Sequence, residues 1–564
     1  MNKYKICSFW AILSLCLFSL CSCSNQAAVS ISGRAGDHSA SVASATIALS
    51  ALTGNNTAAC PAAGVLPAWC QHPFTGQSDS RSGIVTSQFD PPAGNVSDED
   101  IHSYLGQSGS EAKIFANFML GYCTSTSSAY CHNNVQTGYT ADDENTIAAQ
   151  AADLQRRHID GAIMSWDGDG TSQDEATLLF QSWANLNACS GSQGCTLTYL
   201  IMYNAASLDY NVASTGIPGT SGQSCSGLTG QTYETCAVAH LRNDLCYING
   251  AHWGNAAYQR ANGRPILEVF PDETILPATG PAPSWTDVWM QIGDWTNDLP
   301  QHCAIAPFNS DHGVPLIVFE NRAGFTHEAS SGSFYWVNPA GTDLATDQFT
   351  YNISQAADSG TLDSFLKSAI TFNGELAFSG AFKGFNSIQA TWGTGRIMDQ
   401  QCGQTWMDSL TEGNKYYIGG VPYLQIATWN DYNEGTEIES GIDNCYTISA
   451  ETSGSSLNWE LNPSSAAASL LTVSHIEIYD SPDGTNLTLV ATQPAAMGGS
   501  WSLAGLTSGT HTLYVRMVGK NSILNQISPA ILYKKLAAKS DPAAIIPCRP
   551  IQSGRPTRIL CPLL

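Results

Sequence analysis

Two acidic residues, Asp431 and Glu434, lie three positions apart directly after an apolar run, 421–428, which has the length and composition of a buried strand. Hydrolysis of a glycosidic bond requires two carboxyl groups. One holds a proton for the leaving oxygen, and the other is ionised to activate water or to act as the nucleophile. This pair therefore predicts a catalytic site for glycoside cleavage. The alternative is a strand-end loop whose acids only cap a helix or bind solvent.

Other residues around this pair, or at the ends of further predicted strands, are candidates for binding substrate. Acids and amides there could bind sugar hydroxyls, and aromatic faces could stack on sugar rings. Solvated loop acids and ordinary core packing are the alternatives, and an acid inside an apolar run could instead pair with a barrel cation. The candidates are Trp166, Asp167, Tyr203, Glu268, Glu320, Trp336, Trp429, Asn430 and Tyr432.

Eight short apolar runs precede or include this site, with helical patterns between most of them. Alternating strands and helices over some hundreds of residues predict a (β/α)₈ TIM barrel whose active site lies at the carboxyl ends of the strands. The interval between the fifth and sixth runs is too short for a normal helix, which predicts an irregular connection there. The runs are Ile114–Leu120, Gly161–Ser165, Leu197–Tyr203, Pro265–Phe270, Pro315–Glu320, Phe334–Val337, Leu376–Phe382 and Tyr423–Trp429.

Segments along this region resemble glycoside hydrolase family 71, the endo-α-1,3-glucanases (mutanases). The stretch Thr428-Trp-Asn-Asp-Tyr-Asn-Glu-Gly-Thr436 resembles the last-strand motif of that family and is also similar to the Asn-Glu-Trp-x-Glu-Gly-Thr motif of family 99 endo-α-mannosidases. The other matching segments are 114–121, 157–164, 332–339 and 404–408.

The resemblance implies that Asp431 acts as base and Glu434 as general acid, with inversion favoured and endo-α-1,3-glucan as the first substrate. The sequence has Asn433-Glu-Gly-Thr436 where the mutanases tend to have Gly-Glu-Ser. This departure leaves sugar and linkage open. Endo-α-mannanase or mannosidase activity, or a non-catalytic polysaccharide-binding surface lipoprotein, are the alternatives.

The chain is acidic but carries few charges. It has 23 Lys and Arg against 47 Asp and Glu, a net charge of −24, yet only 12% of its 564 residues are charged. This balance argues against nucleic acid or an anionic membrane surface as a partner. It is typical of an exported protein that acts on a neutral polysaccharide.

The first residues predict export. Lys3 and Lys5 precede an apolar segment, 6–20, which is too short to span a membrane. The following Leu20-Cys-Ser-Cys23 resembles a bacterial lipobox, with Cys23 as the lipidated residue, and Ser24 in such lipoproteins implies the outer membrane or cell surface. Plain secretion is the alternative.

The predicted organisation has five parts. They are a lipoprotein signal peptide (1–23), a Ser/Ala/Gly-rich tether and cap (24–96), the barrel (97–445), a small β-sandwich (446–535) and a tail (536–564). The sandwich is predicted from short alternating runs separated by turn residues, and the Tyr514-Val-Arg-Met pattern resembles fibronectin type III modules. Such modules usually serve as spacers or supports.

Fourteen cysteines remain beyond the signal peptide, an even number that suits disulfides in an exported protein. No C-x-x-C spacing occurs, and Asp167-Gly-Asp-Gly170 does not continue with the spacing of an EF-hand. We therefore predict no metal and no cofactor. Pairing by proximity gives Cys60–Cys70, Cys123–Cys131, Cys189–Cys195, Cys225–Cys236, Cys246–Cys303, Cys402–Cys445 and Cys548–Cys561.

Overall fold

A computed structural model describes residues 96–537, apart from 107–110, 123–138, 170, 191–193, 206–229, most of 271–307, 339–361, 373–375, most of 388–396, 418–420 and 483–486. The predicted lipidation site Cys23, the signal peptide, nearly all of the tether and the C-terminal tail lie outside these residues. The predicted disulfides Cys60–Cys70, Cys123–Cys131 and Cys548–Cys561 lie outside them too, as does Cys225.

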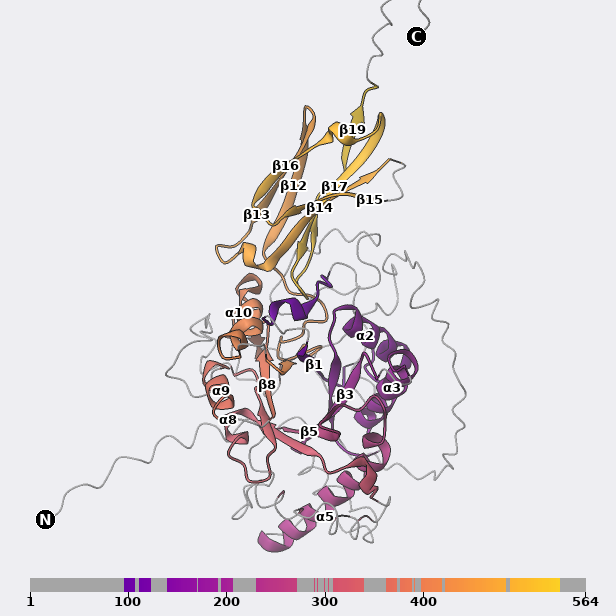
Figure 1. Cartoon of the computed structure of the whole chain (residues 1–564), viewed down its shortest axis with the longest axis vertical. Helices are drawn as coiled ribbons and strands as arrows, with labels where there is room; N and C mark the ends of the chain where they lie inside the picture. The colour runs from indigo at the N-terminus through magenta and orange to yellow at the C-terminus, as the bar shows by residue number, and fades with distance from the viewer. Residues whose placement is uncertain are drawn as a thin grey trace, which may run out of the picture.

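Eight parallel strands close into a barrel, which confirms the (β/α)₈ prediction (Figure 1). Pairing runs in the order β3-β2-β1-β11-β8-β7-β6-β5, and β5 pairs with β3 to complete the ring. Each strand overlaps one of the eight apolar runs. The strands are β1 (Lys113–Phe118), β2 (Gly161–Trp166), β3 (Thr198–Asn204), β5 (Arg264–Phe270), β6 (Leu316–Glu320), β7 (Gly332–Phe334), β8 (Leu376–Ala381) and β11 (Tyr423–Ile426). A short strand, β4 (Arg260–Ala261), pairs with β5 in the antiparallel sense.

Helices cover the outside of the barrel. The described helices are α2 (Glu144–Arg156), α3 (Ser172–Asn187), α5 (Gly230–Ile248), α8 (Asn321–Gly324), α9 (Leu362–Ala369) and α10 (Gln404–Glu412). The side chain of Asp143 accepts a hydrogen bond from the Thr146 N–H and caps α2, since the first turn of a helix leaves its N–H groups unpaired. Between β6 and β7 only the four-residue α8 occurs, as the short interval predicted.

The segment after the last strand of the barrel, residues 427–445, is described throughout and contains no helix. The gap between α2 and α10 is filled instead by this segment and by the turn after β17 (Gly509–Gly519). In that turn Asn521 donates to the main-chain oxygens of Glu99 and Arg157, at 2.7 and 2.9 Å, and its own main-chain oxygen accepts from Nε1 of Trp406 in α10. The second domain therefore completes the wall of the barrel.

The second domain consists of two antiparallel sheets that pack into a β-sandwich, stacked on the barrel at the end where α10 lies (Figure 1). One sheet has the order β12-β13-β16. The other has β15-β14-β17-β18, with β19 also on β17. The remaining strands are β12 (Tyr446–Ser453), β13 (Ser456–Pro463), β14 (Val473–Ser481), β15 (Thr488–Pro494), β16 (Gly498–Ser502), β18 (Gln526–Ile527) and β19 (Ile531–Lys535).

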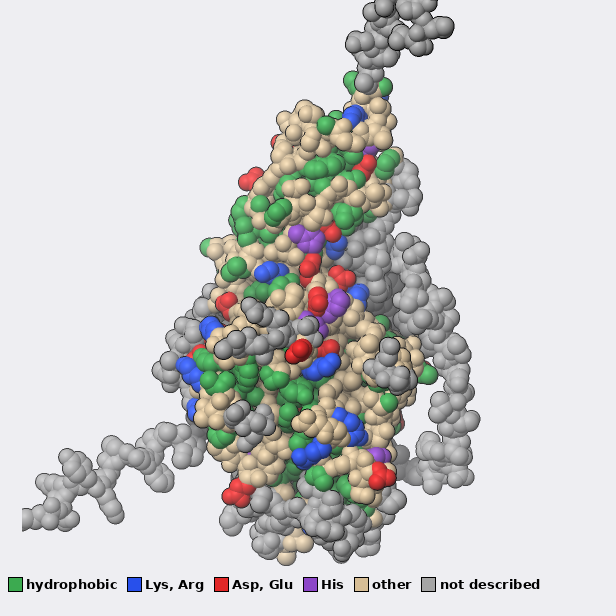
Figure 2. Space-filling model, in the orientation of Figure 1, with side chains coloured by type: hydrophobic (Ala, Val, Ile, Leu, Met, Phe, Trp, Pro, Cys, Tyr) green, Lys and Arg blue, Asp and Glu red, His purple; other side chains and the backbone are tan. Residues whose placement is uncertain are grey.

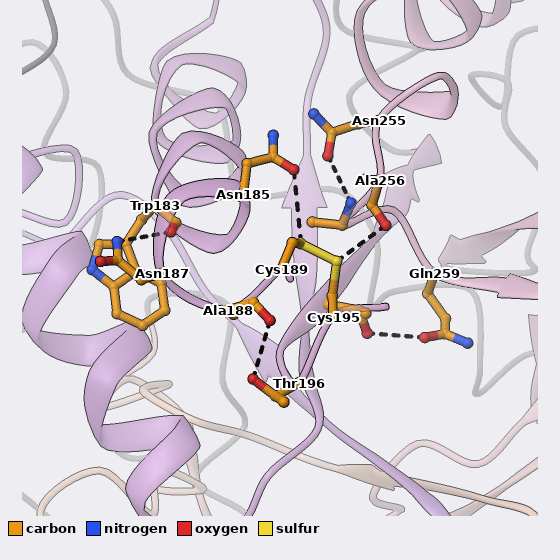
Figure 3. Close-up of a disulfide and its surroundings, with 12 residues drawn as sticks. Trp183, Asn185, Asn187, Ala188, Cys189, Cys195, Thr196, Asn255, Ala256 and Gln259 are labelled. Carbon is orange, nitrogen blue, oxygen red and sulfur yellow. Dashed lines mark hydrogen bonds between the residues drawn. A yellow bond between two sulfur atoms is a disulfide. The ribbon is translucent and has the colours of Figure 1, made fainter. Parts of the chain in front are cut away.

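Three predicted disulfides are confirmed: Cys189–Cys195, Cys246–Cys303 and Cys402–Cys445. The first joins the end of α3 to the start of β3, where the Thr196 side chain also donates to the Ala188 oxygen (Figure 3). The third ties the residues before α10 to the start of β12. Cys236 is also disulfide-bonded.

On the face shown in Figure 2, charged side chains are scattered among uncharged ones, in keeping with the low charged fraction of the sequence. None of the helices among the described residues is both long and apolar enough to cross a membrane.

Candidate active site

The loop after β11 is a compact unit held by its own hydrogen bonds. The Thr428 N–H donates to the Thr436 oxygen at 3.1 Å, and the hydroxyls of these two residues lie 2.9 Å apart. The Thr436 N–H in turn donates to the main-chain oxygen of Asp431 at 3.1 Å. These hydrogen bonds join residues 428 and 436 and close the loop into a turn. Asp431 and Glu434 lie on this turn, at the carboxyl end of the last barrel strand.

Asp431 is buried, with 4% of its surface exposed, and one of its oxygens is fully occupied. Oδ1 accepts hydrogen bonds from the Tyr122 hydroxyl at 2.8 Å and from the main-chain N–H groups of Asn433 and Glu434, each at 3.0 Å. Among the described residues no donor bonds to Oδ2. The carboxylate is therefore held by one oxygen, and the other remains available to a substrate or to water.

Two effects act in opposite directions on the pKa of Asp431. Burial raises it, and the hydrogen bonds from Tyr122, Glu434 and Asn433 oppose the rise because they stabilise the ionised form. The net shift is upward. A carboxylate that is desolvated yet hydrogen-bonded is a stronger base than a solvated one.

Glu434 is only half-buried and lies one residue before a left-handed turn at Gly435, where φ is +61°. A Cβ at this glycine would meet Asn386 at 3.0 Å, so both the backbone and the space there favour glycine. The main-chain oxygen of Glu434 accepts from the Asn386 N–H at 2.6 Å, which fixes the turn against β9 (Phe385–Asn386). The Glu434 side chain thus leaves the turn from a fixed point, next to the N–H that bonds Asp431.

Two further acids of this loop are completely buried. Glu439 accepts hydrogen bonds from the hydroxyls of Tyr139 and Tyr432 and from Nε2 of Gln150, at 2.7–2.8 Å. Glu437 forms an ion pair with the equally buried Lys383, with 2.6 Å between Nζ and Oε1. Burial raises the pKa of each glutamate to about 7, against these partners. Sequence reasoning missed Lys383, whose only signal is a charged residue directly after a buried strand.

The neighbours of the two acids in the motif hold the loop in place, which corrects their prediction as substrate-binding residues. Trp429 is fully buried, and the guanidinium of Arg157 lies 4.8 Å from its ring centre. The side-chain amide of Asn430 bonds the main chain of Met119 in both directions, at 2.8 Å each. The Tyr432 hydroxyl donates its hydrogen bond to Glu439. None of the three offers a face or a polar group to a ligand.

Trp166 and Tyr203 are also corrected, because they point away from the barrel interior. Nδ2 of Asn117 in β1 lies 3.7 Å from Sδ of Met202 in β3, across the intervening β2, so these two residues face inward. Side chains alternate along a strand, and register pairs Met202 with Ser165, so Tyr203 and Trp166 face the helices. Trp166 donates to Asp174 of α3 and Tyr203 to Asp244 of α5, and both rings are buried.

Three other candidates do lie along the inner face at the carboxyl ends of their strands. Glu320 ends β6, and Trp336 follows β7 and packs on Phe270 at the end of β5, with ring centres 4.8 Å apart. Asp167, after β2, is half-buried and accepts from the amides of Asn204 and Gln173 at 2.8 and 2.7 Å.

Glu268 lies deeper on β5 and is fully buried, so it cannot bind a sugar hydroxyl as predicted. Neither of its oxygens has a hydrogen-bond partner among the described residues, and the alternative of a barrel cation is not met either. Burial raises its pKa well above the ordinary value. Desolvation therefore favours the protonated form of this carboxyl in the folded protein.

The site thus contains two carboxyl groups of unequal burial on one hydrogen-bonded loop, and other acids and an aromatic ring lie at the carboxyl ends of other barrel strands. Among the described residues, no group of three or more His, Cys, Asp or Glu side chains is placed to hold a metal ion. Two carboxyl groups on one loop can transfer protons, and Asp431 and Glu434 are the candidates for this chemistry.

Comparisons with known proteins give only distant likenesses. No family model matches the sequence, and no curated protein does. Among solved structures, a family 99 endo-α-mannosidase from Bacteroides thetaiotaomicron aligns with a TM-score of 0.38 at 14% identity, over 58% of this chain and 86% of that one. An endo-β-1,4-mannanase from Thermotoga petrophila aligns with a TM-score of 0.25 at 9% identity, over 78% of this chain and 100% of that one. At these scores the barrel assignment depends on the strand pairing itself.

Proposed function

We propose that this chain is a glycoside hydrolase that cleaves an α-linked polysaccharide, with α-1,3-glucan as the first substrate and α-mannan as the second. The observation that carries the proposal is the state of Asp431, three residues from Glu434 on the same loop. One of its carboxylate oxygens is held by three donors, while no donor among the described residues bonds the other. The motif resemblance described above supports the choice of substrate.

In the proposed reaction Asp431 acts as base and Glu434 as general acid. Oδ2 of Asp431 takes a proton from a water molecule as that water attacks the anomeric carbon, and Glu434 donates its proton to the departing glycosidic oxygen. The bond between the anomeric carbon and that oxygen breaks, and the configuration inverts. The donors to Oδ1 keep the Asp431 carboxylate oriented throughout.

Release of reducing sugar from insoluble α-1,3-glucan and from α-mannan tests the proposal. The wild-type protein should cleave one of them, and Asp431→Asn and Glu434→Gln should each lower the rate by about 100-fold or more. Glu460→Gln, on an exposed position of β13, is the matched control and should keep full activity. The anomeric configuration of the first product, followed by NMR, separates inversion from retention.

A different outcome would favour a different function. If the wild-type protein binds an α-glycan but releases no sugar from a broad panel, the barrel is a polysaccharide-binding module and the catalytic proposal fails. Loss of activity in the Glu460→Gln control would mean that the variants report on folding rather than on chemistry.

We also propose that the protein is exported and anchored at the outer membrane or cell surface through a lipid on Cys23. Three disulfides among the described residues support an oxidising compartment. The intact protein should partition into detergent after temperature-induced phase separation, and Cys23→Ser should move it to the aqueous phase. Aqueous partition of the wild-type protein would instead indicate plain secretion.

A further inference from the structure

The ion pair between Lys383 and Glu437 lies inside the proposed active site but has no role in the reaction described so far. Lys383 follows β8 by two residues, and Glu437 belongs to the loop after β11, the strand next to β8 in the barrel. Both side chains have no exposed surface, and their Nζ and Oε1 atoms are 2.6 Å apart. The pair therefore bridges two neighbouring strand ends at the catalytic face.

Stability alone does not account for such a pair. The cost of removing two charges from water commonly equals or exceeds their attraction, and apolar replacements of similar volume are often neutral or stabilising. Moreover, Oε2 of Glu437 is buried without a hydrogen-bond partner among the described residues. Glu439, two residues on, shows what a purely structural acid looks like here, since both of its oxygens accept hydrogen bonds.

Glu437 is coupled to Asp431 through the chain and through space. The residue before it, Thr436, donates its N–H to the main-chain oxygen of Asp431, so the two acids belong to one closed turn. Among the described residues, the charged and titratable groups that interact with Glu437 are Lys383 from the end of β8, and Asp431 and Tyr432 from its own loop. The negative charge of Asp431 contributes to the raised pKa of Glu437, and Lys383 lowers it.

We propose that Glu437, with Lys383 as its counter-ion, is a positioning residue for Asp431, which adds or withdraws a negative charge beside the catalytic base according to whether Glu437 holds a proton. This inference rests on the proposed function of Asp431. When Glu437 is protonated, Lys383 is an unbalanced cation and Asp431 is the only carboxylate of the trio. When Glu437 ionises, the pair becomes neutral and its carboxylate repels that of Asp431, which makes Asp431 a stronger base.

A titration that does not depend on activity tests the coupling. The γ-carbon of Asp431, observed by NMR in protein labelled at Asp carboxyl carbons and identified by its absence in Asp431→Asn, should titrate in two steps. The main step reports Asp431 itself, and a smaller step near pH 7 reports Glu437. In Glu437→Gln, which mimics the protonated form and keeps an acceptor for Lys383, the smaller step should vanish while the main step remains.

Lys383→Met provides a second and opposite signature. Because the Lys383 cation lowers the pKa of Glu437, its removal should move the smaller step upward by about one pH unit or more. Lys367→Met, which removes the cation of a partly exposed pair with Asp363 on α9, is the matched control and should leave both steps unchanged. A single-step titration in the wild-type protein, or a small step that survives in Glu437→Gln, would overturn the proposal.

Hydrolysis gives the corresponding readout and separates the two proposals. The pH profile of kcat/KM should show an inflection near pH 7 in the wild-type protein, absent from Glu437→Gln and displaced upward in Lys383→Met. Two titration steps with no hydrolysis of any α-glycan would leave the coupling intact and defeat the proposed function. Hydrolysis with a single titration step would defeat the coupling alone.

Discussion

The hydroxyl of Tyr122 donates a 2.8 Å hydrogen bond to Oδ1 of Asp431, although the two residues are 309 positions apart in the sequence. They meet because β1 and β11 are neighbours in the closed barrel, so the segments that leave these strands run side by side. The same hydroxyl accepts from the Asn433 N–H at 3.1 Å. Tyr122 therefore orients Asp431, the proposed catalytic base, and also supports the turn that leads to Glu434.

Tyr122→Phe should raise the pKa of Asp431, because the lost hydrogen bond stabilises its ionised form. A base with a higher pKa is protonated over a wider acidic range, so the acidic limb of the kcat/KM profile should move to higher pH. At pH values on the acidic limb, kcat/KM of the variant should be about threefold to tenfold lower than that of the wild-type protein. The measurement is the rate of reducing-sugar release against pH for both proteins.

The matched control is Tyr139→Phe. Tyr139 also donates a buried 2.8 Å hydrogen bond to a carboxylate of this loop, but its acceptor is Glu439. Both variants should lose comparable stability, about 1–3 kcal/mol, since each leaves a buried acceptor short of a donor. Only Tyr122→Phe should displace the acidic limb. Equal displacement in the two variants would show that the loop responds as a whole.

Arg157 should be essential for the stability of the loop. Its guanidinium is completely buried and donates to the main-chain oxygens of Ile438 and Glu439 and to Asp153, at 2.6–2.7 Å. Arg157→Met removes this donor from the two main-chain oxygens and from Oδ2 of Asp153, and should lower the free energy of unfolding by about 3–5 kcal/mol in denaturant titrations. Arg156→Met removes a partly exposed cation beside the same Asp153 and should cost less than about 1 kcal/mol. Similar losses would contradict the burial argument.

Glu268→Gln should change how stability depends on pH. Because burial raises the pKa of Glu268 well above 4.5, the folded state holds a proton that the unfolded chain releases. The contribution of Glu268 is fully present below about pH 4.5 and declines as pH rises, by at most about 1.4 kcal/mol per pH unit. The variant lacks this decline, so its advantage over the wild-type protein should grow from pH 5 to pH 8 in denaturant titrations. A constant difference would show that Glu268 is not the titrating group.

The barrel could be predicted from the sequence because its strands are buried on both faces and therefore appear as continuous apolar runs. The same property explains why the sequence predicts Trp166 and Tyr203 as substrate-binding residues although their side chains face the helices. An apolar run does not reveal which alternate residues face inward, and the contact from Asn117 to Met202 on the far side of β2 settles it.

The two candidate catalytic acids were accessible to sequence reasoning because a single turn of chain places both, whereas Tyr122 and Lys383 reach the site from other strands. In the local sequence, Lys383 is marked only as a charged residue after a buried strand, and nothing marks Tyr122. The absent eighth helix escaped prediction for a similar reason, since its replacement is a turn of the sandwich about 90 residues further on.

Asn521 should show that the sandwich is a structural part of the barrel. Its side-chain amide donates to the main-chain oxygens of Glu99 and Arg157, on the side of the barrel where no helix follows the last strand. The Asn521 side chain is fully buried. Asn521→Ala should therefore lower the free energy of unfolding by about 2–3 kcal/mol, because two carbonyl groups lose their donor. Asn462→Ala is the matched control, since its amide also donates to two oxygens but on the exposed face of β13, and should cost less than about 0.5 kcal/mol.

If the barrel and the sandwich were independent, Asn521→Ala would lower only one of two separate unfolding transitions. A single cooperative transition that shifts as a whole, followed by both tryptophan fluorescence and far-UV circular dichroism, is the outcome expected from a shared wall.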